Sequence, residues 1–293
     1  MNLHEYMVGL REEIDGDLVS LIECPSESPM LIETMLYSIK NGGKRLRPIL
    51  LLMTLEAFGA SRFKGQGTAV ALEMFHTYSL LHDDLPAMDN DDLRRGKPTN
   101  HKIYGEAMAI LAGDGLLTDA FRVIAEHTEL TAEVRLRLVQ MLSVYAGVEC
   151  GMITGQVLDI QAEEKVISLE ELKKVHRFKT GALIEFACLA AGVIAEQDHD
   201  VLLKLKLFSE SLGLAFQIQD DILDVEGDMA KIGKTVGSDE VNGKSTYVSL
   251  LGLVDAKQML ADEIGKALQF LDELPADTNR LKELTLYVAS RES

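Results

Sequence analysis

The sequence predicts an all-α protein, and three observations lead to this fold class. Apolar residues recur three or four positions apart along almost the whole chain, which is the spacing of one helix face. Ala, Leu, Glu and Met, which are good helix formers, dominate these stretches, and only 6 prolines interrupt them. The sequence shows neither a convincing hairpin pattern nor an alternating rhythm of strands and helices.

The chain is long and apolar enough for one large core, since it has 293 residues and a hydrophobic content of 47%. Turn-rich connectors, rather than flexible linkers, separate the helical stretches. We therefore expect a single domain over residues 1–293, built from about a dozen helices of ordinary length.

The individual helices follow from the same periodicity. Near the N-terminus, it predicts helices over EEIDGDLVSLIE (12–23), LIETMLYSIK (31–40) and PILLLMTLEAF (48–58). The most apolar helices should lie at the centre, and they are expected over residues 67–85, 106–126, 149–162, 180–195 and 202–225. Gly113 and Gly115 lie inside the second of these, at a cost of about 1 kcal/mol each relative to Ala. Either close helix packing or access for a substrate explains them.

The net charge excludes one broad class of function. With 29 basic and 47 acidic residues, the chain carries a formal charge of −18. Such a surface repels phosphates, so we expect no nucleic-acid partner. An anionic substrate must instead meet a local basic pocket or bound metal ions.

The cysteines and the apolar runs indicate a cytoplasmic protein. Cys24, Cys150 and Cys188 are odd in number, far apart and outside any CxxC pattern, which argues against a disulfide framework or a zinc site. The N-terminal stretch MNLHEYMVGLREEIDGD lacks the apolar core of a signal peptide. No apolar run reaches the length of a membrane span, and residues 186–193 are expected to form a buried helix.

The stretch LLHDDLPAMDNDDLRRGKPTN (80–100) crowds carboxylates together and then turns basic. Asp83 and Asp89 are six residues apart, which corresponds to about 600° of helical rotation and places them on opposite faces of a regular helix. Both can serve one site only if the helix ends between them. Pro86 provides the reason for such an end, because it lacks an N–H and clashes with the preceding turn. We expect Asp83, Asp84 and Asp89 to form a cation site.

A second cluster, FQIQDDILDVEGD (216–228), lies far downstream. Asp220 and Asp224 are four residues apart and therefore point from one face of a helix, with Asp221 beside them. Three carboxylates at the end of an apolar helix form an oxygen-rich site for a hard cation such as Mg²⁺.

Each cluster alone is better explained by a solvated acidic helix end than by a metal site. Two clusters, each after a very apolar helix and each followed by Lys or Arg, favour metal binding. His82 next to Asp83 also suggests a phosphohydrolase of the HD type, but no matching downstream set of histidine ligands is present.

The motifs together resemble the trans-isoprenyl diphosphate synthases, and most closely the bacterial-type farnesyl diphosphate synthases. The resemblance covers most of the chain, because several further motifs occur in the family's order: GGKRLRP (42–48), EMFHTYSLLHDD (73–84), ILAGDGLL (110–117), GQVLDI (155–160), KTGALI (179–184) and GKST (243–246). It implies the isoprenoid synthase (terpenoid synthase) fold, a helical bundle around a deep central cavity, and a homodimer.

The resemblance also implies a reaction, in which isopentenyl diphosphate is condensed with dimethylallyl and then geranyl diphosphate to give (2E,6E)-farnesyl diphosphate. Three Mg²⁺ ions would assist the ionisation of the allylic diphosphate, held by Asp83, Asp84, Asp89, Asp220, Asp221 and Asp224. The residues implied to bind that diphosphate are Arg94, Lys179, Thr180, Gln217 and Lys234, and Lys244 is a further candidate. Lys179 and Lys234 count among the catalytic residues.

The second substrate, isopentenyl diphosphate, needs an anion site without metal. GGKRLRP suits this role, since Gly42 and Gly43 allow close backbone approach and arginine can bind phosphate in a bidentate manner. The resemblance implies that this site comprises Lys44, Arg47, His76 and Arg95. It further implies that the aromatic ring of Tyr78 forms the floor of the cavity and limits the product to fifteen carbons.

Several rival functions remain to be distinguished. A geranylgeranyl diphosphate synthase of the same family would make a longer product. A terpene cyclase would carry an Asn/Asp–Ser/Thr–Glu motif in place of DDILD and would not need GGKRLRP. A non-catalytic synthase subunit should lack one aspartate motif, whereas this chain has both.

Overall fold

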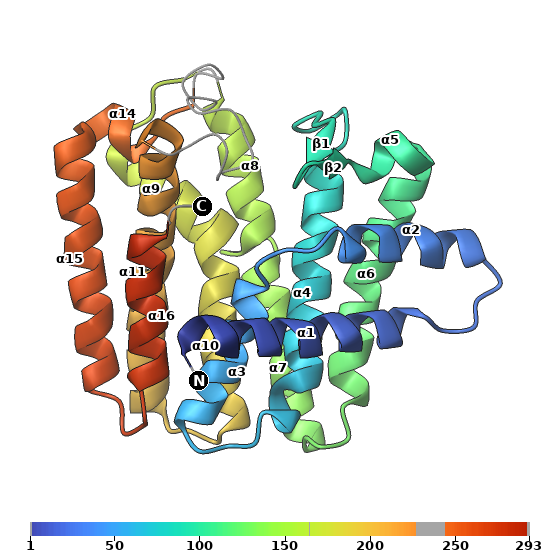
Figure 1. The fold of residues 1–293 in the computed structure, drawn as a ribbon, viewed down its shortest axis with the longest axis horizontal. Coiled ribbons are helices and arrows are strands. Elements are labelled where there is room, and N and C mark those ends of the chain that lie inside the picture. The colour runs from blue at the N-terminus through green and yellow to red at the C-terminus, as the bar shows by residue number, and fades with distance from the viewer. Residues whose placement is uncertain (1, 164, 227–243, 292–293) are drawn as a thin grey trace. The chain divides into compact units, whose positions relative to one another are not determined.

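The computed structural model describes residues 2–163, 165–226 and 244–291, and nearly all of its regular structure is helical (Figure 1). This confirms the predicted all-α class. The described residues divide into two compact units. One contains the chain up to Leu52 together with Ser61–Val139, and the other contains Met53–Ala60 and the chain from Gln140 onward.

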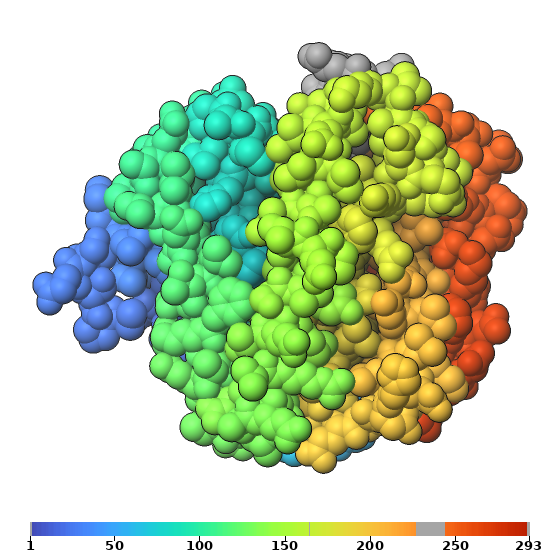
Figure 2. Space-filling model, turned by 180° about the vertical axis from the view of Figure 1, so that it is seen from behind, coloured from blue at the N-terminus to red at the C-terminus, as the bar shows by residue number. Residues whose placement is uncertain are grey.

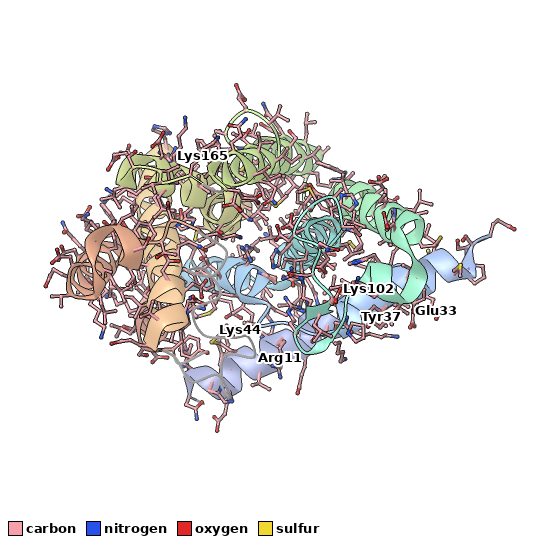
Figure 3. The ribbon with its side chains drawn as sticks, turned by 90° about the horizontal axis from the view of Figure 1, so that it is seen from above. Arg11, Glu33, Tyr37, Lys44, Lys102 and Lys165 are labelled. Carbon is pink, nitrogen blue, oxygen red and sulfur yellow. The ribbon has the colours of Figure 1, made fainter. Side chains whose placement is uncertain are left out.

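The first unit is organised around a pair of long helices. Its elements are α1 (Leu3–Ile22), α2 (Pro29–Lys40), the first part of α3 (Leu46–Ala57), α4 (Phe63–Asp83), α5 (Asn100–Tyr104), α6 (Glu106–Glu126) and the first part of α7 (Ala132–Ala146). Helix α4 packs along α6, and α2 contacts both α6 and α5. Figure 3 shows Glu33 and Tyr37 on α2 beside Lys102 of α5.

Local sequence signals explain where these helices begin. Helix α1 starts with a capping box, in which Asn2 accepts a hydrogen bond from the backbone N–H of Glu5 and the Glu5 side chain bonds back to the Asn2 N–H. Helix α2 starts at Pro29, a position where the missing N–H costs nothing.

A two-residue hairpin interrupts the helical pattern. Strand β1 (Leu93–Arg94) pairs antiparallel with β2 (Lys97–Pro98), and this hairpin was not predicted from the sequence. Arg95 and Gly96 form the turn, and both have a positive φ, of 55° and 75°. A turn of this kind favours Asn or Gly at its first position, and an arginine there hides the signal.

The second unit is built around α11 (His199–Glu226). The other elements are the last parts of α3 and α7, together with α8 (Met152–Ala162), α9 (Leu169–His176), the π-helix η1 (Arg177–Gly181), α10 (Ala182–Ile194), α14 (Tyr247–Leu251), α15 (Leu253–Asp272) and α16 (Asn279–Ser290). Helix α11 packs against α15, α10 and α16. Every residue of α10 is buried, as expected for residues 186–193. The segment containing α8 and α9, which is yellow-green in Figure 2, lies at the surface of this unit.

The five central helices expected from the sequence all exist, with ends shifted by up to four residues. In the described part of the chain, no helix is both long enough and apolar enough to cross a membrane. The single domain over residues 1–293 stays a prediction.

Candidate active site

The first aspartate cluster lies where α4 ends. The helix stops at Asp83, and the backbone N–H of Asp89 donates a 2.9 Å hydrogen bond to the Asp83 carbonyl oxygen. The chain therefore folds back after Pro86 and returns Asp89 to the end of the helix, as its sequence predicts.

An arginine already compensates the most buried carboxylate of this cluster. Asp84 has only 4% exposure, and it accepts a 2.5 Å hydrogen bond from Arg94 Nε. Arg94 also contacts Asp91, at 3.3 Å. Burial raises the pKa of Asp84, and Arg94 opposes that rise. Arg94 thus faces the carboxylates that precede it in the sequence.

His82 has a structural explanation that does not need a metal. Its ring lies directly over Gly113 of α6, where any larger residue would collide with the imidazole. Nε2 lies 3.2 Å from the Ile110 carbonyl oxygen, and the ring packs edge-on against Tyr78. Close packing therefore accounts for Gly113, and Gly115 likewise leaves room for Met35.

Tyr78 is buried on α4, five residues before Asp83. Its ring also meets Phe75 edge-on, with centroids 4.6 Å apart. Burial, with a contribution from Asp83, raises the pKa of Tyr78 to about 12, so the phenol stays neutral.

Arginines surround the largely buried His76 in the first unit. Arg47 donates a hydrogen bond of 3.2 Å to His76 Nε2, so that nitrogen is the acceptor and the ring proton is on Nδ1. Burial lowers the pKa of His76 well below its usual value, and the charges of Arg47, Arg95, Arg45 and Arg94 lower it further. Several cations around a neutral imidazole form a ready site for an anion.

The structure explains why one of the two glycines of the GGKRLRP loop, Gly43, has no side chain. A Cβ on Gly43 would come within 2.7 Å of the Arg95 guanidinium, and Gly43 has φ of 149°. The hairpin turn therefore places Arg95 against the loop that leads into α3, and Arg47 lies in the first turn of that helix. Lys44 lies in the same loop, between α2 and α3, and is labelled in Figure 3.

Arg45 was not recognised from the sequence, yet it anchors this loop. Its guanidinium donates to Asp15 of α1, to Glu73 of α4 and to the Ile39 carbonyl oxygen of α2, each at 2.7 Å. The side chain is only 1% exposed. Breaking one partner of such a buried pair typically costs about 3–5 kcal/mol. The only sequence signal was a second arginine two residues before Arg47.

The second aspartate cluster lies on the last turns of α11, as predicted. Asp221 and Asp224 are buried, each with 6% exposure. Asp221 accepts a 2.7 Å hydrogen bond from the backbone N–H of Tyr247, and Asp220 accepts one of 2.6 Å from Arg291. Arg291 also lies over the Phe216 ring, at 3.9 Å from its centroid.

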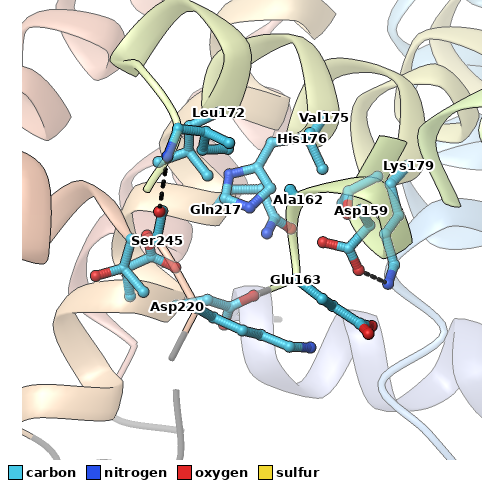
Figure 4. Close-up of a pocket in the computed structure, with 15 residues that line it drawn as sticks. Asp159, Ala162, Glu163, Leu172, Val175, His176, Lys179, Gln217, Asp220 and Ser245 are labelled. Atoms are coloured by element: carbon cyan, nitrogen blue, oxygen red, sulfur yellow. Dashed lines mark hydrogen bonds and ion pairs between the residues drawn. The ribbon is translucent and has the colours of Figure 1, made fainter. Parts of the chain in front are cut away.

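A cavity of about 300 Å³ in the second unit collects most of the residues predicted for the allylic diphosphate (Figure 4). The predicted residues that line it are Lys179, Thr180, Gln217, Asp220, Asp221 and Lys244. The lining residues that sequence reasoning missed include Asp159, Glu163 and His176. Lys234 lies outside the described residues.

His176 stays neutral in this cavity. Burial lowers its pKa to about 4, while Asp159 raises it and Lys179 and Lys244 lower it. The ring packs against Tyr247, with centroids 5.3 Å apart. The imidazole therefore adds no charge to the lysines that face the cavity.

The aspartate clusters suit a divalent cation that arrives with a phosphate. In the described parts of the chain, no three Asp, Glu, His or Cys side chains converge closely enough to enclose a metal by themselves. Mg²⁺ prefers oxygen ligands and is usually bound by only one or two carboxylates, with water and phosphate oxygens completing its coordination shell. The carboxylates of both clusters fit this requirement by their chemistry.

Comparison with known proteins gives the family. The family model for polyprenyl synthetases matches residues 28–284, and the chain belongs to this family. It is 47% identical over 292 residues to the farnesyl diphosphate synthase of Bacillus subtilis (strain 168), covering 99% of this chain and 98% of that protein. It is 51% identical over 267 residues to the farnesyl diphosphate synthase of Micrococcus luteus, covering 91% of each.

Solved structures agree with the fold. The chain is similar to an FPP/GFPP synthase from Zymomonas mobilis, with a TM-score of 0.88, 35% identity and 99% of both chains covered.

One relative by sequence makes a longer product according to its name. This chloroplastic geranylgeranyl pyrophosphate synthase of Catharanthus roseus is 40% identical, covering 98% of this chain and 81% of that protein. The predicted family and fold are confirmed.

Proposed function

We propose that the protein is a farnesyl diphosphate synthase, a prenyltransferase that adds isopentenyl diphosphate to dimethylallyl and then to geranyl diphosphate. One observation supports this most directly: the chain has two groups of cationic side chains that differ in chemistry. The cavity of the second unit combines lysines with aspartates. The group in the first unit consists of arginines around a neutral histidine. Two diphosphate substrates, of which only one binds with metal, require this difference.

The allylic diphosphate is assigned to the metal-binding residues. Asp83, Asp84 and Asp89 of the first motif, with Asp220, Asp221 and Asp224 of the second, would hold Mg²⁺, three ions in all. When bound, the ions act as Lewis acids that stabilise the charge of the departing pyrophosphate. Lys179, Thr180, Gln217 and Lys244 supply further contacts from the cavity wall, and Arg94 and Lys234 complete the set of cations.

Isopentenyl diphosphate is assigned to Lys44, Arg47, His76 and Arg95. The neutral state of His76 is useful here, because its Nδ1 proton can donate to a phosphate oxygen while Nε2 accepts from Arg47. Arg47 and Arg95 provide charge-assisted hydrogen bonds, which are roughly twice as strong as neutral ones.

Product length is assigned to Tyr78. The buried ring on α4 would block a tail longer than fifteen carbons, so that farnesyl diphosphate is the main product. The apolar residues around it, such as Phe75, cannot capture a carbocation and help to exclude water.

The test is incubation with labelled isopentenyl diphosphate, dimethylallyl diphosphate and Mg²⁺, followed by chromatography of the dephosphorylated products. A C15 alcohol that disappears when EDTA is added supports the proposal. A mainly C20 product would make the protein a geranylgeranyl diphosphate synthase instead. A cyclic hydrocarbon without consumption of isopentenyl diphosphate would indicate a terpene cyclase, and activity only with a second subunit would indicate a non-catalytic partner.

A cytoplasmic homodimer is part of the same proposal. Sedimentation of the purified protein tests the dimer, since a monomeric mass at micromolar concentration would contradict it. Fractionation of cells that express the protein tests its location.

A further inference from the structure

The motif GQVLDI (155–160) lies on α8, and the proposed function gives it no role. Helix α8 packs against the π-helix η1, which carries Lys179. A Cβ on Gly155 would collide with the backbone nitrogen of Lys179. The glycine therefore allows the two backbones to touch at the residue that faces the cavity.

One turn later, α8 presents a carboxylate to the same lysine. Asp159 is four residues after Gly155 and therefore lies on the same helix face. Its Oδ2 accepts a 2.6 Å hydrogen bond from Lys179 Nζ, and Figure 4 shows this pair at the edge of the cavity. The two side chains are 22% and 25% exposed, so the pair is partly shielded from water.

Lys179 lies within the π-helix η1. A π-turn widens the helix by one residue and redirects the side chains on it, and such turns occur often at functional sites. A lysine has four flexible carbons, and ordering its side chain on binding costs conformational entropy. A partner that orders the lysine in advance removes this cost from the binding of substrate.

We propose that Asp159 is a positioning residue that holds the ammonium group of Lys179 in place for the allylic diphosphate, with Gly155 setting the distance between the two helices. An ammonium group has three donors, so Lys179 can bond to Asp159 and to a phosphate oxygen together. This inference rests on the proposed function, because it assumes that Lys179 binds the diphosphate.

The test compares Asp159→Asn with a matched control, Glu210→Gln. Glu210 accepts a hydrogen bond of the same length, 2.6 Å, from Arg177 of the same π-helix, but it does not line the cavity. We expect Asp159→Asn to raise the KM for geranyl diphosphate about five- to tenfold, which corresponds to the entropy of ordering one side chain. The KM for isopentenyl diphosphate should change less than twofold, and Glu210→Gln should leave both constants unchanged.

A second measurement keeps the result independent of turnover. Calorimetric binding of inorganic pyrophosphate with Mg²⁺ should weaken about five- to tenfold in Asp159→Asn and stay unchanged in Glu210→Gln. Asp159→Glu, which keeps the charge, should recover part of the affinity.

A double-mutant cycle with Lys179→Gln separates the possible failures. If Asp159 acts through Lys179, adding Asp159→Asn to Lys179→Gln changes the KM for geranyl diphosphate by less than about twofold. A full additional effect, or wild-type constants for Asp159→Asn while Lys179→Gln is impaired, would overturn the inference alone. Wild-type constants for Lys179→Gln would overturn the proposed role of Lys179 and the inference with it.

Discussion

The two aspartate clusters present the same kind of side chain, but different local backbone structures position them. The first lies at a helix end, where the chain reverses after Pro86 and bonds the Asp89 backbone to Asp83. The second lies within the continuous helix α11, where spacing alone places Asp220 and Asp224 on one face. In each cluster an arginine accompanies one carboxylate, namely Arg94 for Asp84 and Arg291 for Asp220.

The difference lies in how far away the arginine is in the sequence. Arg94 follows Asp84 by ten positions, whereas Arg291 follows Asp220 by 71. A local reversal can bring in the first arginine, but only the packing of α16 against α11 can bring in the second. Both carboxylate clusters are thus encoded locally, whereas the balancing arginine is local for the first cluster and depends on tertiary packing for the second.

The largest expected effect tests whether the two clusters are equivalent. Asp83→Ala and Asp220→Ala should each lower kcat by at least about 100-fold, because each removes a carboxylate proposed to hold metal in the transition state. Steady-state kinetics at saturating Mg²⁺ measures this. Asp92→Asn is the control, since Asp92 follows the first motif, is exposed and forms its ion pair with Lys102 of α5. Near-normal turnover in Asp83→Ala or Asp220→Ala would remove that cluster from the site.

Substitutions among the arginines around His76 should affect a different substrate from substitutions in the cavity of the second unit. Arg47→Gln should raise the KM for isopentenyl diphosphate by roughly 10- to 100-fold, because it removes a charge-assisted hydrogen bond worth about 1.5–3 kcal/mol. The KM for geranyl diphosphate should stay within about twofold of the wild-type value. Equal increases for both substrates would contradict the assignment of separate groups.

Tyr78 tests whether the helix that ends at Asp83 also limits product length. Tyr78→Ala removes a buried ring and should shift the product from C15 toward C20 or longer. Tyr78→Phe keeps the ring and should keep the C15 product. Chromatography of the dephosphorylated products measures both, and an unchanged C15 product from Tyr78→Ala would exclude Tyr78 as the floor.

A stability comparison separates close-packed glycines from open ones. Gly155→Ala places a methyl group against the Lys179 backbone and should lower the free energy of unfolding by about 2–3 kcal/mol. Gly16→Ala on α1 has nothing within 4 Å and should raise it by about 0.5–1 kcal/mol. Urea unfolding measures both, and equal effects would contradict the contact between α8 and η1.

The last prediction concerns the pH dependence of stability. The pKa of His176 is about 4 in the folded protein, against about 6.5 for a free histidine, so the unfolded chain binds more protons between these values. Stability must therefore fall as the pH drops from 6.5 toward 4, by about 2 kcal/mol from this group. His176→Gln should show a shallower loss over that window in urea unfolding. An identical slope in both proteins would show that His176 is not buried in the neutral form.

The sequence by itself determined the helical class, the positions of the central helices, the break at Pro86 and the residue types of both clusters. These features depend on neighbours within a turn or two, because helix periodicity and proline sterics are local. The motifs also identified Lys179, Thr180 and Gln217, which the structure brings to one cavity.

Only the tertiary structure decided which charges meet. The pairs Arg45–Glu73, Arg291–Asp220 and Lys179–Asp159 join segments 20 to 71 residues apart. It also decided that Gly113 accommodates His82 and that Gly155 accommodates η1. No spacing rule predicts these contacts, because the partner of a buried charge is set by which distant helices pack together and exclude water around it.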